Sequence, residues 1–296
     1  MSREDWSPDD VPDLTGRRAL VTGAASGTGR EVALGLARHG FRVGLVGRDV
    51  ARTRAAVERI RSSVPGARVD AFTADLSAQA EVRRLAREVR ALYPRLDVLV
   101  NNAGAIFDRH ALTPDGIERT WALDHLAYVL LSLDLLDLLK ASAPSRIVNV
   151  ASAAHTRGRI RFDDLGHARR FSAMAVYSQA KLGNVLFTAA LARRLAGTGV
   201  TVNALHPGVI ASGFAGDTGG WFGLGWRLIR PFMRTPVDGA RTSLHVATAS
   251  DLDGVTGRYF ARSRPKATSR RAADLDLQER VWLLSLDQLG LPQTAA

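Results

Sequence analysis

Cysteine is absent from the 296-residue chain, so disulfides, thiolate-bound zinc and cysteine nucleophiles are excluded. Long apolar runs are absent too, because none reaches the roughly 18 residues that a membrane-spanning helix needs. The first residues, Met1 to Trp6, are polar and acidic, unlike the basic and then apolar start of a secretory signal. These absences predict a cytoplasmic protein without a membrane span.

Lysine is scarce, and only Lys140, Lys181 and Lys266 are lysines among the 40 basic residues. The net charge of +11 therefore comes from arginine spread along the chain. Residues 258–271 carry several basic side chains and no acid. No nucleic-acid-binding motif accompanies them, so we interpret this stretch as solvated surface and predict no nucleic-acid partner.

Short β-rich apolar runs alternate with longer helical patterns along most of the chain. The expected strands are Arg18–Thr22, Arg42–Gly47, Arg68–Phe72, Asp97–Asn101, Arg146–Ala151 and Thr201–Leu205, and the expected helices span 28–39, 50–62, 78–92, 114–140 and 174–196. Regular spacing and short connections favour parallel β-α-β units. The prediction is an α/β fold: a single doubly wound, Rossmann-type domain over 1–296. Its mainly parallel sheet has about seven strands with helices on both faces, after an N-terminal extension at 1–16.

The pattern loosens after Leu205, and residues 213–236 are rich in glycine, tryptophan and phenylalanine. Segments beyond the carboxyl ends of such strands form the ligand crevice, so we predict a substrate lid at 213–236. The competing interpretation is an amphipathic helix at 221–234 on a membrane surface. Its apolar face is short and broken by glycine, which weighs against it.

A glycine-rich turn follows the first expected strand directly, and a helical pattern begins at Arg30. Glycines let the turn tighten and let a pyrophosphate approach the backbone, where a helix N-terminus supplies amide donors. The spacing is G-x-x-x-G-x-G rather than the G-x-G-x-x-G of long-chain dehydrogenases. The turn predicts a dinucleotide site made by Gly23, Ser26, Gly27, Thr28 and Gly29.

The residues at the end of the second expected strand decide between NAD and NADP. Gly47 has no carboxylate to bind the adenosine ribose or to repel a 2′-phosphate. Arg48 can make charge-assisted hydrogen bonds to that phosphate, and Arg30 can add to the field. Asp49 lies two positions past the usual acidic site, where it can equally cap the next helix. The pattern favours NADP.

Tyr177 and Lys181 are the clearest catalytic signal, because residues four apart share one face of a helix. An ammonium beside a phenol lowers the phenol's pKa from about 10 toward the working pH. Ser152 follows a buried strand, where open α/β sheets place ligands, and would hold the substrate oxygen. An isolated serine is more often a turn residue, so its partnership with Tyr177 carries this assignment.

These motifs together resemble the short-chain dehydrogenase/reductase family, and within it the retinol-dehydrogenase-like branch, over nearly the whole chain. The matching stretches, in the family's order, are Thr22–Gly29, Ala74–Leu76, Asn101–Gly104, Ile147–His155, Tyr177–Lys181 and His206–Gly208, with Trp6–Gly16 and Gly254–Phe260 also similar. Several motifs in one order are far more specific than any of them alone.

The resemblance implies a hydride transfer between NADP(H) and a small, apolar ketone, aldehyde or alcohol. Tyr177 would be the general acid/base, Ser152 would orient the carbonyl, and Lys181 would also hold the nicotinamide ribose. Further implied cofactor contacts are Asp75 and Leu76 at the adenine, Asn102, Ala103 and Gly104 on the adenosine side, and Pro207, Gly208, Ile210 and Ser212 at the carboxamide.

One departure from the family pattern stands at Asp124, where the family has a catalytic asparagine that props a water leading from the lysine to solvent. An aspartate has nearly the same shape but can carry charge. Close to Tyr177 it would oppose ionisation of the phenol, and otherwise it can accept a hydrogen bond from Lys181 or a water. The sequence therefore does not decide whether Asp124 supports or weakens the proton relay.

A second hypothesis therefore stays beside the oxidoreductase: a nucleotide-binding protein of this fold with a non-redox or scaffold role. No spacing of histidine, aspartate and glutamate forms a metal site. The leucine-rich stretch Val129–Leu139 and the expected helix at 174–196 would serve as a homodimer face, or equally well as a buried part of the monomer.

Overall fold

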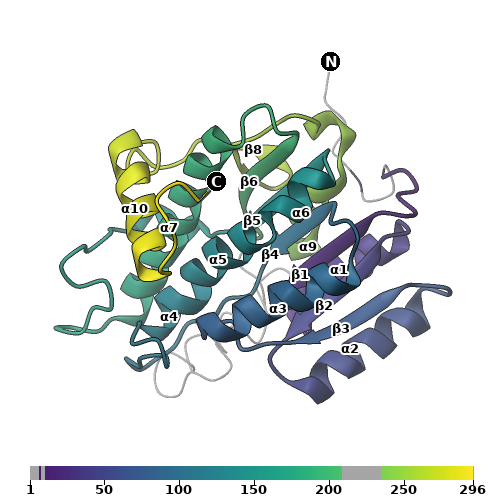
Figure 1. Cartoon of the computed structure of the whole chain (residues 1–296), viewed down its shortest axis with the longest axis horizontal. Helices are drawn as coiled ribbons and strands as arrows, with labels where there is room; N and C mark the ends of the chain where they lie inside the picture. The colour runs from purple at the N-terminus through teal and green to yellow at the C-terminus, as the bar shows by residue number, and fades with distance from the viewer. Residues whose placement is uncertain (1–6, 8–10, 209–234, 296) are drawn as a thin grey trace.

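The computed structural model describes residues 7, 11–208 and 235–295, and an eight-stranded sheet runs through its centre (Figure 1). The strand order is β3-β2-β1-β4-β5-β6-β7-β8, parallel throughout except for the β7–β8 pair. The strands are β1 (Arg18–Thr22), β2 (Arg42–Gly47), β3 (Val69–Thr73), β4 (Val98–Asn101), β5 (Ser145–Val150), β6 (Val200–His206), β7 (Tyr259–Ala261) and β8 (Arg264–Pro265).

Helices connect the strands and cover both faces of the sheet. The α-helices are α1 (Gly27–Arg38), α2 (Val50–Ser63), α3 (Gln79–Leu92), α4 (Arg119–Trp121), α5 (Ala127–Asp134), α6 (Leu136–Ala141), α7 (Ala173–Arg194), α9 (Pro236–Thr248) and α10 (Leu275–Gln288). The shorter turns are the π-helical η2 (Ala122–Leu126) and the 3₁₀-helical η3 (Ala153–Arg157) and η6 (Ser250–Leu252). The predicted doubly wound α/β fold is confirmed, and the two-residue antiparallel β8 is an addition to it.

Apolar side chains of the strands fill cores on both faces of the sheet. In β1, Leu20 packs with α3, α5 and α7, whereas Ala19 and Val21 pack with α1, α2 and α9. The sheet order reverses at β1, whose neighbours are β2 and β4. Such a reversal opens a crevice at the carboxyl ends of the strands, which is where the candidate site lies.

The long helix expected over 114–140 is wrong as a continuous element. The Glu118 carboxylate caps α4 by accepting from the Trp121 amide at 2.8 Å, so the helix begins there. One π turn, η2, then precedes α5, and a break at Leu135 separates α5 from α6. The apolar periodicity continues through both irregularities because all three segments bury the same face.

The C-terminal helix α10 packs against α7, where it is drawn in yellow in Figure 1. Trp282 stacks on Phe187 with 5.8 Å between ring centroids and an interplanar angle of 10°. The Arg194 guanidinium lies 4.1 Å from the centre of the Trp282 ring and pairs with Glu279 at 2.7 Å. Much of the stretch Val129–Leu139 is also buried in the chain's own core, so α10 and this core cover the face considered for a dimer.

Two further expectations concern regions that the structure describes only in part. The expected lid at 213–236 and the alternative surface helix at 221–234 lie outside the described residues, except for Thr235 and Pro236. Thr235 is the N-cap of α9, and Pro236 is its first residue. Within the described residues, no helix combines the length and the apolar character needed to cross a membrane.

Replacing Trp282 with alanine should destabilise the fold by about 3–5 kcal/mol, because the ring is 1% exposed and fills the junction of α10 and α7. Denaturant unfolding measures the loss. Leu275→Ala on the same helix is the control, since Leu275 is 63% exposed. Equal effects from both variants would show that α10 contributes little to the core.

Candidate active site

The glycine-rich turn lies between β1 and α1 and has the shape that a phosphate cradle requires. Gly23 and Gly27 adopt φ values of +65° and +57°, which favour glycine. A Cβ on Gly23 would lie 2.8 Å from the Ala103 Cα, and one on Gly29 would collide with the Asn102 amide. Ser26 precedes α1 without a side-chain capping bond, which leaves the first amides of the helix available to an anion. These residues fit a dinucleotide pyrophosphate.

Thr22, the last residue of β1, joins this turn to the end of β4. Its hydroxyl oxygen accepts from the amides of Asn102 at 2.8 Å and Ala103 at 3.0 Å, while Asn102 Nδ2 donates to the Thr22 carbonyl at 2.8 Å. Sequence reasoning did not assign Thr22. Its only signal was a hydroxyl residue at the end of an apolar strand next to glycine.

The end of β2 presents one cation and a carboxylate that is already engaged. Arg48 is exposed and makes no ion pair within the described part of the chain. Asp49 Oδ1 accepts from the Arg52 amide at 2.8 Å and so caps α2, as one of the two interpretations expected. Arg30, expected to add to the field, instead pairs with Glu31 at 2.8 Å.

Four more of the expected cofactor residues, Asp75, Leu76, Pro207 and Gly208, follow the carboxyl ends of β3 and β6. Asp75 Oδ1 accepts from the amide and hydroxyl of Ser77 at 3.0 and 2.7 Å, and Leu76 is buried beside them. Pro207 and Gly208 follow β6, and Gly208 has a φ of +104°. Ile210 and Ser212 lie outside the described residues.

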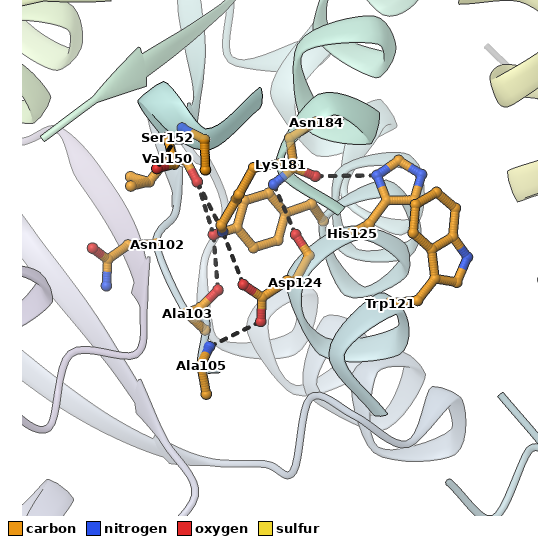
Figure 2. Close-up of polar contacts among 12 residues, drawn as sticks. Asn102, Ala103, Ala105, Trp121, Asp124, His125, Val150, Ser152, Lys181 and Asn184 are labelled. Carbon is orange, nitrogen blue, oxygen red and sulfur yellow. Dashed lines mark hydrogen bonds and ion pairs between the residues drawn. The ribbon is translucent and has the colours of Figure 1, made fainter. Parts of the chain in front are cut away.

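Ser152, Tyr177 and Lys181 meet at the carboxyl end of β5. Ser152 follows that strand and caps η3 by accepting from the Ala154 amide at 3.2 Å. Tyr177 and Lys181 lie one turn apart on α7, both buried, and the Lys181 Nζ is 5.6 Å from the centre of the Tyr177 ring. Lys181 also donates to the Val150 carbonyl at 3.2 Å (Figure 2). The three residues predicted from separate motifs are thus brought together.

Burial raises the pKa of the Tyr177 phenol above its ordinary value, and the charge of Asp124 adds to this, whereas a hydrogen bond with Ser152 lowers it. The net direction is opposite to the lowering expected from Lys181. Burial is the largest cause of this raised pKa, and the Lys181 charge that would oppose it is compensated by the Asp124 carboxylate beside the ammonium. Tyr177 is therefore protonated at neutral pH in this arrangement.

Asp124 lies in η2 and forms a buried ion pair with Lys181, with 3.1 Å between Oδ2 and Nζ and side chains 0% and 3% exposed. Its Oδ1 accepts from the Ala105 amide at 2.9 Å (Figure 2). Complete burial raises the pKa of this carboxyl, while Lys181 and the Ala105 amide act in the opposite direction. Both roles open to Asp124 are therefore seen, because it pairs with Lys181 and its charge also raises the pKa of Tyr177.

Two more residues shape this site: Gly104, which the sequence predicted only as a cofactor contact, and Tyr128, to which no sequence pattern pointed. Gly104 leaves room for the ion pair, since a Cβ there would lie 2.8 Å from Asp124 Oδ2 and 3.2 Å from Lys181 Nζ. The Tyr128 hydroxyl donates to the Ala103 carbonyl at 2.8 Å, which ties α5 to the end of β4. Among the described residues, no cluster of histidine, aspartate and glutamate could hold a metal ion.

Comparison with known proteins places these residues in context. The model of the short chain dehydrogenase family matches residues 17–221. Human retinol dehydrogenase 12 is 41% identical over 278 residues, which cover 94% of this chain and 88% of that protein. Human retinol dehydrogenase 13 is 40% identical, over 94% of this chain and 86% of its own length.

Solved structures agree with this likeness. An uncharacterised protein from Mycobacterium paratuberculosis superposes with a TM-score of 0.79 and 31% identity, over 97% of this chain and 98% of that chain. A 3-oxoacyl (acyl-carrier-protein) reductase from Agrobacterium tumefaciens, solved with NADP bound, has a TM-score of 0.69 and 26% identity, over 88% and 98% of the two chains.

Proposed function

The chain belongs to the short-chain dehydrogenase family, in its retinol-dehydrogenase-like branch, and we propose that it is an NADP(H)-dependent carbonyl reductase or alcohol dehydrogenase. Family membership makes it an oxidoreductase of alcohol and carbonyl groups. The observation that carries the finer proposal is the meeting of Ser152, Tyr177 and Lys181 at the strand ends beside the glycine-rich turn.

The side chains divide the work between orientation and proton transfer. Ser152 and Tyr177 hydrogen-bond the carbonyl oxygen, and Tyr177 passes its proton to that oxygen on reduction and takes it back on oxidation. A nicotinamide bound here would supply or accept the hydride. Lys181 would hold the nicotinamide ribose, and the burial of Tyr177 and Lys181 limits the access of water to the reacting oxygen.

NADP is the proposed cofactor because the Arg48 guanidinium is exposed, has no ion pair among the described residues, and stands where the 2′-phosphate would lie. The nearby Asp49 carboxylate is engaged as a helix cap, and Gly47 has no side chain to repel the phosphate. The bound NADP of the Agrobacterium tumefaciens reductase supports this choice.

The proposed substrate is a small, apolar ketone, aldehyde or alcohol, a class supported by the names of the retinol dehydrogenases among the relatives. The alternative, a non-redox or scaffold role for the nucleotide-binding fold, depended on Asp124. Its pairing with Lys181 leaves the contact between Ser152 and Tyr177 in place, which favours redox chemistry. A homodimer and a cytoplasmic location stay predictions.

Arg48→Ala should weaken NADPH binding by about 1.5–3 kcal/mol, because it removes a charge-assisted hydrogen bond, and should change NADH binding little. Fluorescence titration of the two nucleotides measures the difference. The matched control is Arg59→Ala, an exposed arginine near the other end of α2. Equal losses for NADPH and NADH would remove Arg48 from phosphate recognition.

Tyr177→Phe should reduce turnover roughly a hundredfold or more while preserving fold and NADPH binding, since only the proton-transferring hydroxyl is deleted. Loss of NADPH absorbance with a panel of ketones and aldehydes reports the rate. Tyr93→Phe, far along the sheet and bonded to Asp70, is the matched loss of a buried hydroxyl. A Tyr177→Phe enzyme as fast as wild type would mean that the proton comes from another group.

Asp124→Asn should keep turnover near wild type or raise it, and should move the pH optimum of alcohol oxidation downward. Oxidation needs the ionised phenol, and removing the carboxylate both deletes a charge that raises the Tyr177 pKa and frees the charge of Lys181. The pH dependence of kcat/KM measures this shift. Abolished activity would support the non-redox alternative, and an unchanged profile would show that Asp124 does not act on the phenol.

A further inference from the structure

The π turn η2 carries a second buried side chain directly after the catalytic-site carboxylate. Asp124 and His125 are both 0% exposed. Figure 2 shows Asp124 facing Lys181, while His125 lies on the other side of the turn with Asn184 and Trp121. Nothing in the chemistry of Ser152, Tyr177 and Lys181 requires an imidazole there, so its role must come from its contacts.

A chain of hydrogen bonds runs from His125 back to the peptide of Asp124. Asn184 Nδ2 donates to the Asp124 carbonyl at 2.7 Å, and Asn184 Oδ1 lies 3.1 Å from His125 Nδ1. A carbonyl can only accept, which fixes the orientation of the Asn184 amide and makes its Oδ1 an acceptor. His125 Nδ1 must therefore carry a proton and donate it to Asn184.

The other ring nitrogen of His125 reaches the C-terminal helix. His125 Nε2 lies 2.9 Å from the hydroxyl oxygen of Ser285 on α10, which also lies 2.7 Å from the Val281 carbonyl. Complete burial lowers the pKa of His125 to about 4, against the opposing hydrogen bond of Asn184, so the ring is neutral at physiological pH. With Nδ1 protonated, Nε2 can only accept, and the single proton of the Ser285 hydroxyl is shared between Nε2 and the Val281 carbonyl.

Packing gives the imidazole a single position. A Cβ on Gly183 would lie 2.8 Å from His125 Nδ1, so α7 accommodates the ring only because that residue is glycine. Trp121 covers the other side with 4.2 Å between ring centroids. The Trp121 indole in turn donates to Gln288 on α10 at 2.8 Å. Three elements, η2, α7 and α10, thus converge on His125.

We propose that His125 is a positioning residue that holds the Asp124 peptide through Asn184 and thereby keeps the Asp124 carboxylate against Lys181. The inference rests on the proposed function, because the pairing it maintains acts on the proton transfer of Tyr177. A π turn inserts an extra residue into the helix, and here one carbonyl of that turn, that of Asp124, accepts from a side chain. Asn184 is the donor, and His125 orients it.

Titratable groups on every element packed around the Asp124–Lys181 pair interact with it electrostatically. They are Glu118 at the start of α4, Asp124 and His125 in η2, Tyr128 in α5, Tyr177 and Lys181 in α7, and Tyr259 in β7. Asp124 and Lys181 are the two buried charges nearest the phenol, and their separation decides how much lysine charge reaches it. A displaced Asp124 leaves that charge uncompensated and lowers the Tyr177 pKa.

Two substitutions at His125 distinguish its hydrogen bond to Asn184 from its hydrogen bond to Ser285. His125→Asn places an amide near Nδ1 and retains a donor for Asn184, whereas His125→Gln retains an acceptor near Nε2 and loses that donor. We expect His125→Gln to move the pH profile of kcat/KM for alcohol oxidation downward by about one unit. His125→Asn should keep the wild-type profile. Equal shifts in both variants, or a lowered Tm with no shift in either, would overturn the proposal.

Ser285→Ala is the structural control, because it removes the bond to α10 and leaves the bond to Asn184. It should lower Tm and leave the pH profile in place, and a shift as large as that of His125→Gln would contradict the assigned route. Nitrogen-15 NMR of the full-length wild type tests the geometry without turnover. A neutral ring protonated on Nδ1 between pH 6 and 8 is expected, at least two units above a pKa of about 4. A ring protonated on Nε2, or a cationic ring, would overturn the proposal for His125. A wild-type protein that oxidises no alcohol would instead contradict the proposed function.

Discussion

A carboxylate and an ammonium removed from water must face each other, and the ion pair between Asp124 and Lys181 imposes that constraint on everything around it. Burying one charge alone costs far more than a marginally stable fold can supply. Each partner accordingly has a second bond, Asp124 from the Ala105 amide and Lys181 to the Val150 carbonyl. Gly104 leaves the space between them, and β4, β5, η2 and α7 must meet at this point for the pair to exist.

The same pair explains how the site differs from a lysine acting alone on a phenol. An uncompensated ammonium beside Tyr177 would promote its ionisation, whereas the paired one leaves burial as the dominant influence on the phenol. The protonated phenol is the form that can donate to a carbonyl oxygen. A carboxylate in place of an amide in η2 thus changes the electrostatics of the site.

The sequence predicted the features whose signals are local. The strand ending at Thr22, the glycine turn after it and the Tyr177–Lys181 spacing all reappear at the expected places, because alternation, glycine conformation and helical period act over a few residues. The π turn η2 and the start of α4 at Glu118 were not predicted, because they depend on particular side-chain contacts rather than on a local pattern. The π turn depends on Asn184 and the cap of α4 on Glu118, and apolar periodicity registers neither of them. The sequence left the role of Asp124 open, because its distances to Lys181 and Tyr177 depend on where η2 and α7 meet.

The attachment of η2 to α10 has a consequence for the order in which the molecule is completed. Trp121 and Gln288 are 167 positions apart in the chain, and His125 and Ser285 are 160 apart. The nucleotide-binding turn, by contrast, joins β1 to residues about half that distance away, with Asn102 and Thr22 separated by 80 positions. Contacts of such long range form late, and an emerging chain cannot make them before α10 leaves the ribosome. The contacts of the phosphate cradle need only residues synthesised before α5, whereas the catalytic turn acquires its final geometry only after α10 has been made.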